Sequence, residues 1–287
     1  MFENFPIPAS FSLVHKGKVF LLLKDEYKDI LLEQGIEHIK TFIRKHRQTS
    51  QYVKGRALHP SIPLKEGKRI VVRQHLHGGL LRVFTRDLYF SGSRSFEELA
   101  LTVQIRDCGI STAQPIGAIH QTFGPFYKAY LVSLEIPGAK DLIQYFQEMG
   151  AHPSREPLLQ KRRTIRSAGQ LIHHLHASGF FHQDLQLKNI LVSGDQLFLI
   201  DFDRSYHKRG LTAAEKKKNL LRLDRSVEKW ERFGLPISRT DRLRFLGAYA
   251  EKDEEMRKAM VKILQTCSSG HLFHRWGWAI QRVLKRW

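Results

Sequence analysis

The sequence predicts an α+β protein of two lobes, a sheet-rich lobe over residues 1–137 and a larger, mainly helical lobe over residues 138–287. The first part holds short strand-like runs, whereas apolar residues in the second part recur at helical spacing. Pro137 and Gly138 end the last alternating run, which suits a linker between lobes. A chain of 287 residues, 42% of them hydrophobic, is long enough to bury a substantial core.

The charge of the chain predicts an anionic partner. Lys and Arg total 47 against 28 acidic residues, which gives a formal net charge of +19, spread along the whole chain. Nucleotide phosphates, nucleic acid and an acidic membrane surface all attract such a charge. Nucleic acid is not expected as the partner, because no basic arm, zinc-ligand spacing or pattern of stacking aromatics accompanies the charge.

Two other classes of protein are disfavoured by composition. The chain has two cysteines, Cys108 and Cys267, no CxxC spacing, and no basic segment followed by a long apolar one near its start, so a disulfide scaffold or a secreted enzyme is not expected. The longest apolar runs are far shorter than the roughly 20 residues that cross a bilayer. Membrane contact would therefore be peripheral.

The first elements follow from local patterns. Residues 19–23 form a continuous apolar run that predicts a strand, and residues 25–34 predict a helix that Gly35 ends. Residues 52–74 contain two extended pieces around a connection rich in Gly, Pro and Lys. The second piece, residues 69–74, completes a predicted hairpin.

A helix with clear ends follows in "SRSFEELALTVQIRDCG". Ser95 is expected to cap its start and Gly109 to end it. Glu97 and Glu98 lie near the start, where the helix dipole favours acids. The next stretch, "FGPFYKAYLVSLEIPGAK", alternates as a strand does and ends at the linker.

The second lobe predicts a helix over residues 164–177 with one apolar stripe toward a core. The stripe is Ile165, Ala168, Ile172, Leu175 and Gly179. The histidines of "IHHLH" at residues 172–176 are interpreted as packed or solvated. Adjacent helical positions point about 100° apart and no Cys or acid completes a metal-ligand set.

The last 17 residues, "HLFHRWGWAIQRVLKRW", predict a basic amphipathic helix. Its apolar stripe either lies in the headgroup region of an anionic membrane or packs on the second lobe. The pattern alone leaves both interpretations open.

Two isolated acids in the apolar stretch "FFHQDLQLKNILVSGDQLFLIDFDRS" carry the functional prediction. Residues 190–200 hold two short apolar strands joined by a turn, so the ends of this hairpin lie side by side. Asn189 before the first strand and Asp201 after the second then come close to Asp184. Such oxygen ligands suit a magnesium ion shared with nucleotide phosphates. Phosphoryl transfer also needs a carboxylate that takes the proton of the acceptor hydroxyl, and Asp184 is the remaining acid.

The order and spacing of these residues resemble the catalytic and metal loops of the protein-kinase-like superfamily. "HQDL" at residues 182–185, Asn189 and "DFD" at residues 201–203 carry the resemblance. It implies a two-lobed protein-kinase-like fold, ATP and Mg²⁺ as cofactors, Asp184 as the catalytic residue, and Asn189 and Asp201 as metal ligands. A buried hairpin with incidental capping acids leaves the combined spacing unexplained.

The same resemblance implies contacts with the nucleotide in the first lobe. "IVVRQH" takes the place of the strand that carries a phosphate-binding lysine, and Arg73 stands at that position. Arginine keeps the charge and can bind phosphate with two N–H groups, although its geometry differs from that of an ammonium. Lys54 and Lys65 are the alternatives. Glu98 of the following helix is the expected partner of the cation, with Glu97 as the second choice.

Two further parts of the superfamily pattern are incomplete in this chain. No GxGxxG run is present, and Gly55 in "VKGRALHP" is the glycine expected near the nucleotide phosphates. Asp203 follows Phe202 where a glycine would complete the DFG pattern. A switch of the protein-kinase activation-loop type is therefore not expected.

Longer segments resemble a narrower family, the bacterial 3-deoxy-D-manno-octulosonic acid kinases and the related lipopolysaccharide core heptose kinases. The likeness spans residues 54 to about 226, and its marks are residues 73–79, Pro115 and "DFDR" at 201–204. It implies transfer of the ATP γ-phosphate to a sugar hydroxyl of the inner core on a lipid A precursor. The enzyme would act at the cytoplasmic face of the inner membrane, in peripheral contact with it, and its positive charge agrees with an anionic glycolipid substrate.

Two other functions share this predicted fold. One is a kinase for a small soluble alcohol or an antibiotic, which differs in the acceptor alone. The other is a nucleotide-binding pseudokinase scaffold, which the presence of Asp184, Asn189 and Asp201 disfavours. The patterns also leave open whether octulosonic acid or heptose is the acceptor.

Overall fold

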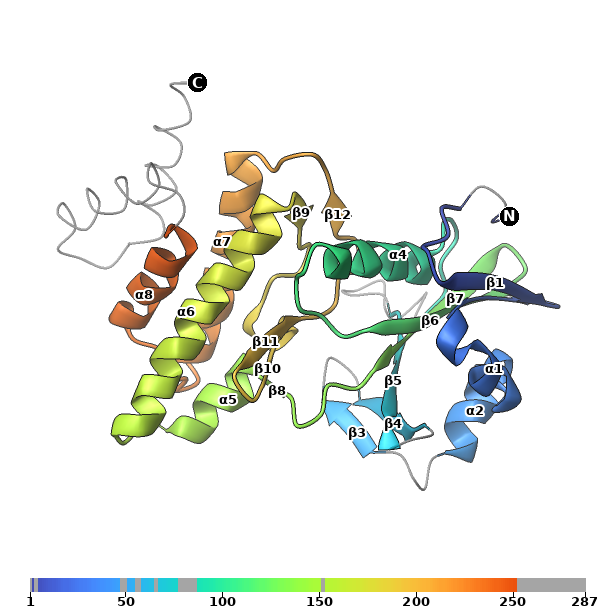
Figure 1. Ribbon diagram of the computed structural model, residues 1–287, viewed down its shortest axis with the longest axis horizontal. Coiled ribbons are helices and arrows are strands. Elements are labelled where there is room, and N and C mark those ends of the chain that lie inside the picture. Colours follow the sequence, from blue (N-terminus) through green and yellow to red (C-terminus); the bar gives the residue numbers. More distant parts are fainter. Residues whose placement is uncertain are drawn as a thin grey trace. The chain divides into compact units, whose positions relative to one another are not determined.

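The protein is represented by a computed structural model (Figure 1), which describes residues 2, 5–46, 51–54, 58–64, 67–76, 87–150 and 153–251, with residues 51–54 and 58 as backbone only. The chain divides into two compact units. The first comprises Met1–Asp107 and Thr112–Ile136, and the second comprises Cys108–Ser111 and Pro137–Trp287. The amphipathic helix expected over residues 271–287 lies outside the described residues.

In the described part of the first unit, seven strands form an antiparallel sheet in the order β1-β2-β6-β7-β5-β4-β3. The strands are β1 (Phe11–Lys16), β2 (Val19–Lys24), β3 (Gln51–Lys54), β4 (Leu58–Pro63), β5 (Arg69–Gln74), β6 (Pro115–Phe123) and β7 (Phe126–Leu134). The helices are α1 (Asp25–Glu33), the 3₁₀ turn η1 (Ile36–His38), α2 (Ile39–Lys45) and α4 (Arg94–Asp107). The predicted hairpin is confirmed as β4 and β5, but the first extended piece is two strands, β3 and β4.

Strand β2 has core on both of its faces. Leu21 and Leu23 belong to a cluster with residues of α1 and α2, whereas Leu22 belongs to a second cluster with Phe96 of α4. Successive side chains of a strand point to opposite faces, so α4 covers one face of the sheet and α1 and α2 the other (Figure 1). This explains why the run at residues 19–23 is continuously apolar rather than alternating.

Helix α4 begins before the residue that the sequence predicted as its cap. The helix starts at Arg94, and the Glu97 carboxylate accepts a hydrogen bond from the Ser93 N–H at 3.3 Å. Ser95 lies inside the helix, and its hydroxyl donates to the Ile119 carbonyl on β6 at 3.0 Å. The predicted Ser95 cap is therefore wrong, because this serine satisfies a contact with the sheet. The predicted end is correct, since Gly109 has a φ of 76°.

The second unit is mainly helical. Its helices are α5 (Leu142–Met149), α6 (Arg155–Ala177), the 3₁₀ turn η3 (Leu187–Asn189), α7 (Ala213–Glu231) and α8 (Arg239–Tyr249). Its short strands are β8 (Lys140–Asp141), β9 (Phe180–Phe181), β10 (Ile190–Ser193), β11 (Gln196–Leu199) and β12 (Tyr206–His207). Figure 1 shows α6 and α8 side by side, and they are in direct contact.

Helix α6 is longer at its start than the apolar stripe predicted. Lys161 lies one turn before Ile165 on the buried side, and its ammonium contacts the Asp241 carboxylate of α8 at 2.8 Å. A charged residue thus occupies a position that the stripe would give to an apolar one. The apolar pattern predicts only the part of the helix that packs through hydrophobic contacts.

Candidate functional site

The loop that carries Asp184 is anchored where α6 ends. Gly179 has a φ of 81°, and a Cβ on it would lie 2.0 Å from the carbonyl oxygen of Lys208, so a side chain cannot be placed there. Strand β9 follows directly and pairs with β12. The Phe181 ring stacks on Tyr206 with ring centroids 4.9 Å apart. The entry to the loop is therefore fixed by backbone pairing and by ring contacts.

His182 is the internal support of the loop. Its side chain is buried, its Nε2 donates to the Ile200 carbonyl at 3.1 Å, and its Nδ1 accepts from the Asp184 N–H at 3.1 Å. The side-chain amide of Asn219 on α7 bonds both backbone groups of His182: it accepts from the His182 N–H at 3.1 Å and donates to the His182 carbonyl at 3.0 Å. One of these four hydrogen bonds lies within the loop, and the other three connect it to the residue after β11 and to α7.

The histidines of α6 have structural surroundings. His176 is buried, with its Nδ1 2.8 Å from the Tyr249 hydroxyl and its Nε2 3.1 Å from the Asn219 amide oxygen. Burial lowers the pKa of His176 to about 4, so it is neutral at physiological pH. His173 packs on the edge of Tyr249, and His174 is exposed.

The Asp184 carboxylate is surrounded by donors from its own loop and from α7. Its Oδ1 accepts from Arg222 at 2.6 Å (Nη2) and 3.0 Å (Nε), and also from the Gln186 amide. The Lys188 ammonium lies 3.6 Å from its Oδ2. Sequence reasoning missed these partners. Gln186 and Lys188 stand inside the motif and could have been noted, whereas Arg222 lies far along the chain on a helix with many cations.

The hairpin between Asn189 and Asp201 is formed as predicted. Ile190 pairs with Leu199 and Ser193 with Gln196, and the Ile200 N–H donates to the Asn189 carbonyl at 3.0 Å. Asn189 and the residue just before Asp201 are thus backbone neighbours. The Asn189 amide nitrogen donates to the Asp184 carbonyl at 2.7 Å, which leaves its Oδ1 as the atom suited to a cation.

Asp201 has an uncommon backbone conformation. Its φ is 68°, in the left-handed region that few residues other than glycine adopt. Such conformations persist where the surrounding structure over-determines them, and they concentrate at functional sites. The following residue, Phe202, is buried with its ring centroid 4.9 Å from that of His182.

The first unit holds a charged cluster on β5 and α4. Arg73 and His75 are two residues apart on one extended segment and therefore share a face. Both contact the Glu98 carboxylate of α4: the Arg73 guanidinium donates to Oε2, and His75 Nε2 lies 2.8 Å from the same oxygen. The predicted pairing of Arg73 with Glu98 is present. His75 was missed, although its spacing from Arg73 could have indicated it.

Glu98 is ionised inside the protein. Its side chain is 1% exposed. Burial raises the pKa of the carboxyl, but the charge of Arg73 and the hydrogen bond from His75 outweigh it and bring the pKa to about 2. Arg73 is therefore held in place by a buried negative charge. Of the other residues proposed for the nucleotide, Gly55 and Lys65 lie outside the described residues, and Lys54 is described as backbone only.

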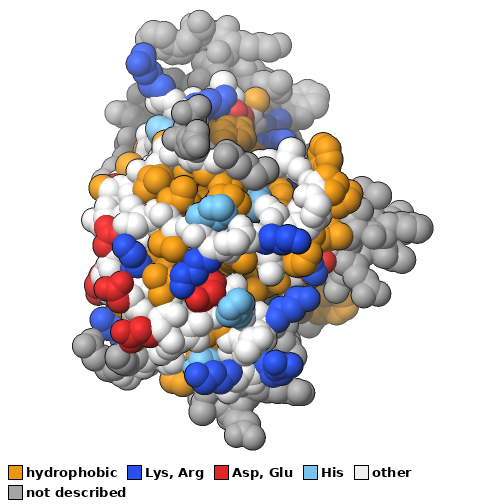
Figure 2. Space-filling view, turned by 90° about the vertical axis from the view of Figure 1, so that its right-hand side faces the viewer, with side chains coloured by type: hydrophobic (Ala, Val, Ile, Leu, Met, Phe, Trp, Pro, Cys, Tyr) orange, Lys and Arg blue, Asp and Glu red, His pale blue; other side chains and the backbone are white. Residues whose placement is uncertain are grey.

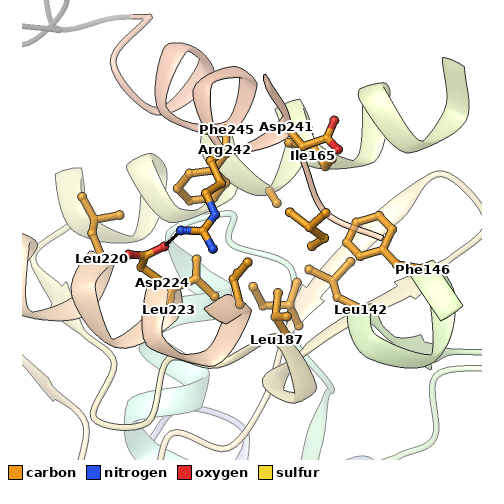
Figure 3. Close-up of a pocket in the computed structure, with 14 residues that line it drawn as sticks. Leu142, Phe146, Ile165, Leu187, Leu220, Leu223, Asp224, Asp241, Arg242 and Phe245 are labelled. Carbon is orange, nitrogen blue, oxygen red and sulfur yellow. Dashed lines mark hydrogen bonds and ion pairs between the residues drawn. The ribbon is translucent and has the colours of Figure 1, made fainter. Parts of the chain in front are cut away.

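A cavity of about 50 Å³ lies in the second unit beside the loop (Figure 3). Its wall is mostly apolar and includes Leu187 of the loop, and the ion pair between Asp224 and Arg242, 2.8 Å apart, lies at one side. Asp184 and Asn189 do not line it. It belongs to the packing that supports the loop rather than to the catalytic groups.

Similarity to known proteins covers most of this chain. The model of the "Lipopolysaccharide kinase (Kdo/WaaP) family" matches residues 40–249. A 3-deoxy-D-manno-octulosonic acid kinase of Pasteurella multocida (strain Pm70) is 31% identical over 248 residues, which cover 82% of this chain and 97% of the relative. The enzyme of the same name from Vibrio cholerae serotype O1 is 36% identical over 163 residues, 55% of this chain and 65% of its own.

A solved structure supports the fold. The protein described as "WaaP in complex with acyl carrier protein" superimposes with a TM-score of 0.57, covering 92% of this chain and 98% of its own at 16% identity. At this identity the likeness concerns the fold alone. The predicted fold class, α+β with a sheet-rich first part and a helical second part, is confirmed.

Proposed function

The chain belongs to the lipopolysaccharide kinase (Kdo/WaaP) family and is a phosphotransferase that acts on a sugar hydroxyl of the lipopolysaccharide inner core, and we propose that its acceptor is a 3-deoxy-D-manno-octulosonic acid residue linked to lipid A. ATP is the proposed phosphate donor. One observation carries the proposed phosphoryl transfer at this site: the β10–β11 hairpin and the His182 bonds gather Asp184, Asn189 and the backbone before Asp201 in one place.

Asp184 is proposed as the residue that activates the acceptor. Its carboxylate would orient the sugar hydroxyl and take its proton while the hydroxyl oxygen bonds to the γ-phosphorus and the bond from that phosphorus to the ADP oxygen breaks. The carboxylate side chain is 13% exposed, so it is accessible and also held by its neighbours. The backbone bond from the Asp184 N–H to His182 sets its direction.

Asn189 and Asp201 are proposed as ligands of Mg²⁺. The amide of Asn189 is oriented by its bond to Asp184, and Asp201 follows the other strand of the hairpin in a constrained conformation. An amide oxygen with a carboxylate is the hard donor set that this ion prefers, with positions left for phosphate oxygens. Bound there, the ion would neutralise charge on the phosphates.

Arg73, held by Glu98, is proposed as the cation for the nucleotide phosphates. Its guanidinium side chain is 21% exposed, whereas that of Glu98 is buried. A guanidinium has five N–H donors, so it can contact a carboxylate and a phosphate together. Gly55 is proposed, on the resemblance alone, as a point where the backbone approaches the phosphates.

The substrate is proposed to be an anionic glycolipid. The enzyme is proposed to bind it at the cytoplasmic face of the inner membrane, in peripheral contact with that membrane. The net charge of +19 supports this. Phe90, Phe123 and Phe126 are exposed by 71%, 41% and 42%, and aromatic side chains of this kind suit the headgroup region. Figure 2 shows Lys and Arg side chains spread among exposed hydrophobic ones on one face. In the part of the chain that the structure covers, no helix has the length and apolarity to cross a bilayer.

The proposal is tested with purified protein, ATP and Mg²⁺ on lipid A that carries octulosonic acid, and in parallel on a core that also carries heptose. The product is analysed by mass spectrometry after fragmentation. We expect one added phosphate on the octulosonic acid residue. Phosphate found on heptose alone, or ATP consumed with no phosphate on either acceptor, would contradict the proposal.

A further inference from the structure

Arg222 contacts one oxygen, Oδ1, of the carboxylate that the reaction needs. Two nitrogens of its guanidinium contact Asp184 Oδ1, at 2.6 and 3.0 Å, and the Gln186 amide donates to the same oxygen. A carboxylate oxygen has two lone pairs, so three donors saturate it. A sugar hydroxyl must come within about 2.6–3.2 Å of the oxygen that takes its proton. The contact between Arg222 and Asp184 therefore competes with the acceptor for Oδ1.

The cations around Asp184 are more accessible than the carboxylate itself. The Arg222 side chain is 36% exposed and that of Lys188 is 25% exposed, against 13% for Asp184. Both cations are thus more exposed than the carboxylate that they contact. A second anion arriving from solvent would meet Arg222 before it met Asp184.

The proposed acceptor carries such an anion. An octulosonic acid has a carboxylate in addition to its hydroxyls, and a guanidinium binds a carboxylate through two parallel N–H bonds. A heptose or another neutral sugar offers no carboxylate to exchange for Asp184. The chemistry around Asp184 therefore distinguishes acidic from neutral acceptors.

We propose that Arg222 binds the carboxylate of the acceptor sugar, exchanging Asp184 for the substrate, and that this exchange releases Oδ1 for the acceptor hydroxyl. The inference rests on the proposed function and adds to it the group that selects an acidic sugar. An acceptor without the carboxylate leaves Arg222 on Asp184, so it loses both a binding contact and access to Oδ1.

The test compares two acceptors, the octulosonic acid substrate and its carboxyl methyl ester, with wild-type enzyme and with Arg222→Gln. In the wild type we expect kcat/KM to be about 100-fold higher for the acid than for the ester, the size of a charged hydrogen-bonded contact. In Arg222→Gln this ratio should fall to within about threefold of one, because activity on the acid falls and activity on the ester does not. Arg225→Gln, an exposed arginine on the same helix, should keep the wild-type ratio.

A second variant covers the case in which Arg222→Gln fails to fold. Arg222→Lys keeps the charge but loses the paired N–H groups, and we expect an intermediate ratio. Equal losses on acid and ester in either variant would show that Arg222 only supports Asp184, and would overturn the inference. A wild-type enzyme that acts on the acid and the ester equally well would overturn the inference and leave the proposed function intact. A wild-type enzyme that phosphorylates neither acceptor would overturn both.

Discussion

Asp184 shows how a single side chain is prepared for proton transfer. The His182 ring accepts from its backbone N–H, and the Gln186 amide donates to its carboxylate. We expect Asp184→Asn to lower kcat by about three orders of magnitude, because an amide cannot take the proton of the acceptor. Asp184 is not among the residues proposed to bind the nucleotide or Mg²⁺, so the affinity for ATP should be unchanged. Single-turnover kinetics with an independent nucleotide-binding assay measures both, and near-normal turnover would remove Asp184 from this role.

Asp201 is expected to act through the metal. In Asp201→Ala, the affinity for ATP measured with Mg²⁺ should fall by more than about tenfold, while the affinity measured without the ion should not change. Asp195→Ala is the matched control, since Asp195 is an exposed acid in the turn of the same hairpin. Calorimetric titration at several Mg²⁺ concentrations gives the comparison. An unchanged response to Mg²⁺ in Asp201→Ala would exclude the carboxylate as a ligand.

At the scale of the elements, the contact between α6 and α8 depends on a glycine. A Cβ on Gly169 would lie 2.4 Å from the Phe245 carbonyl oxygen and 3.0 Å from the Tyr249 amide nitrogen. Alanine normally stabilises a helix interior relative to glycine by about 1 kcal/mol. Here we expect Gly169→Ala to lower the free energy of unfolding by about 1–3 kcal/mol, because the two helices must separate.

Gly247 provides the control for this prediction. It lies in α8, and a Cβ on it would meet no atom within 4 Å. Gly247→Ala should therefore raise the free energy of unfolding by up to about 1 kcal/mol. Urea denaturation of both variants makes the comparison. A stabilised Gly169→Ala variant would mean that the helices are not packed this closely.

The contact between α7 and α8 should depend on pH through Asp224. Burial beside the apolar cavity raises the pKa of this carboxyl to about 7. Arg242 of α8 lowers it, and Glu228 and Glu231 of α7 raise it. The value in the unfolded chain is near 3.8, so the folded state binds more protons between about pH 4 and 7. The contribution of Asp224 to the free energy of unfolding therefore decreases as the pH rises through this window.

Asp224→Asn removes this dependence. We expect the free energy of unfolding of the variant, relative to the wild type, to increase from pH 4 to pH 7 by about 1–4 kcal/mol, since each pKa unit corresponds to about 1.4 kcal/mol. Above about pH 7.5 the difference should be constant. Urea denaturation across the pH range measures it, and a difference that does not vary with pH would contradict the raised pKa.

At the scale of the whole molecule, the positive charge and the exposed aromatics predict binding to anionic vesicles. We expect the protein to co-sediment with vesicles rich in acidic phospholipid, less strongly as salt is added. Replacing Phe123 and Phe126 together by serine should weaken binding by about tenfold, because both lie at the exposed turn between β6 and β7. Phe233→Ser is the control, since Phe233 is 68% exposed and lies in the second unit. Equal losses in both variants would indicate nonspecific adhesion.

Several features of this protein were determined by the sequence itself. The turn between residues 193 and 196 specifies the β10–β11 hairpin, and the hairpin brings Asn189 to the residue before Asp201. Glycines with positive φ end α1 and α4 where the pattern predicted. The resemblance to the kinase-like superfamily, together with the order of strand β5 and helix α4, was enough to pair Arg73 with Glu98. These features depend on residues close together in the chain or on the order of neighbouring elements, which local propensity and periodicity describe.

Only the tertiary structure decided the rest. Arg222 is 38 residues from Asp184, and no local pattern selects it among the cations of α7. Lys161 lies where the stripe predicted an apolar residue, and its ammonium pairs with Asp241. Ser95 does not cap α4, and its hydroxyl bonds to the Ile119 carbonyl instead. In each case a polar side chain forms a hydrogen bond or an ion pair with a group on another element, which comes close only when the two elements pack together. A buried polar group must be paired wherever its partner comes from, so these contacts were fixed only when the elements came together.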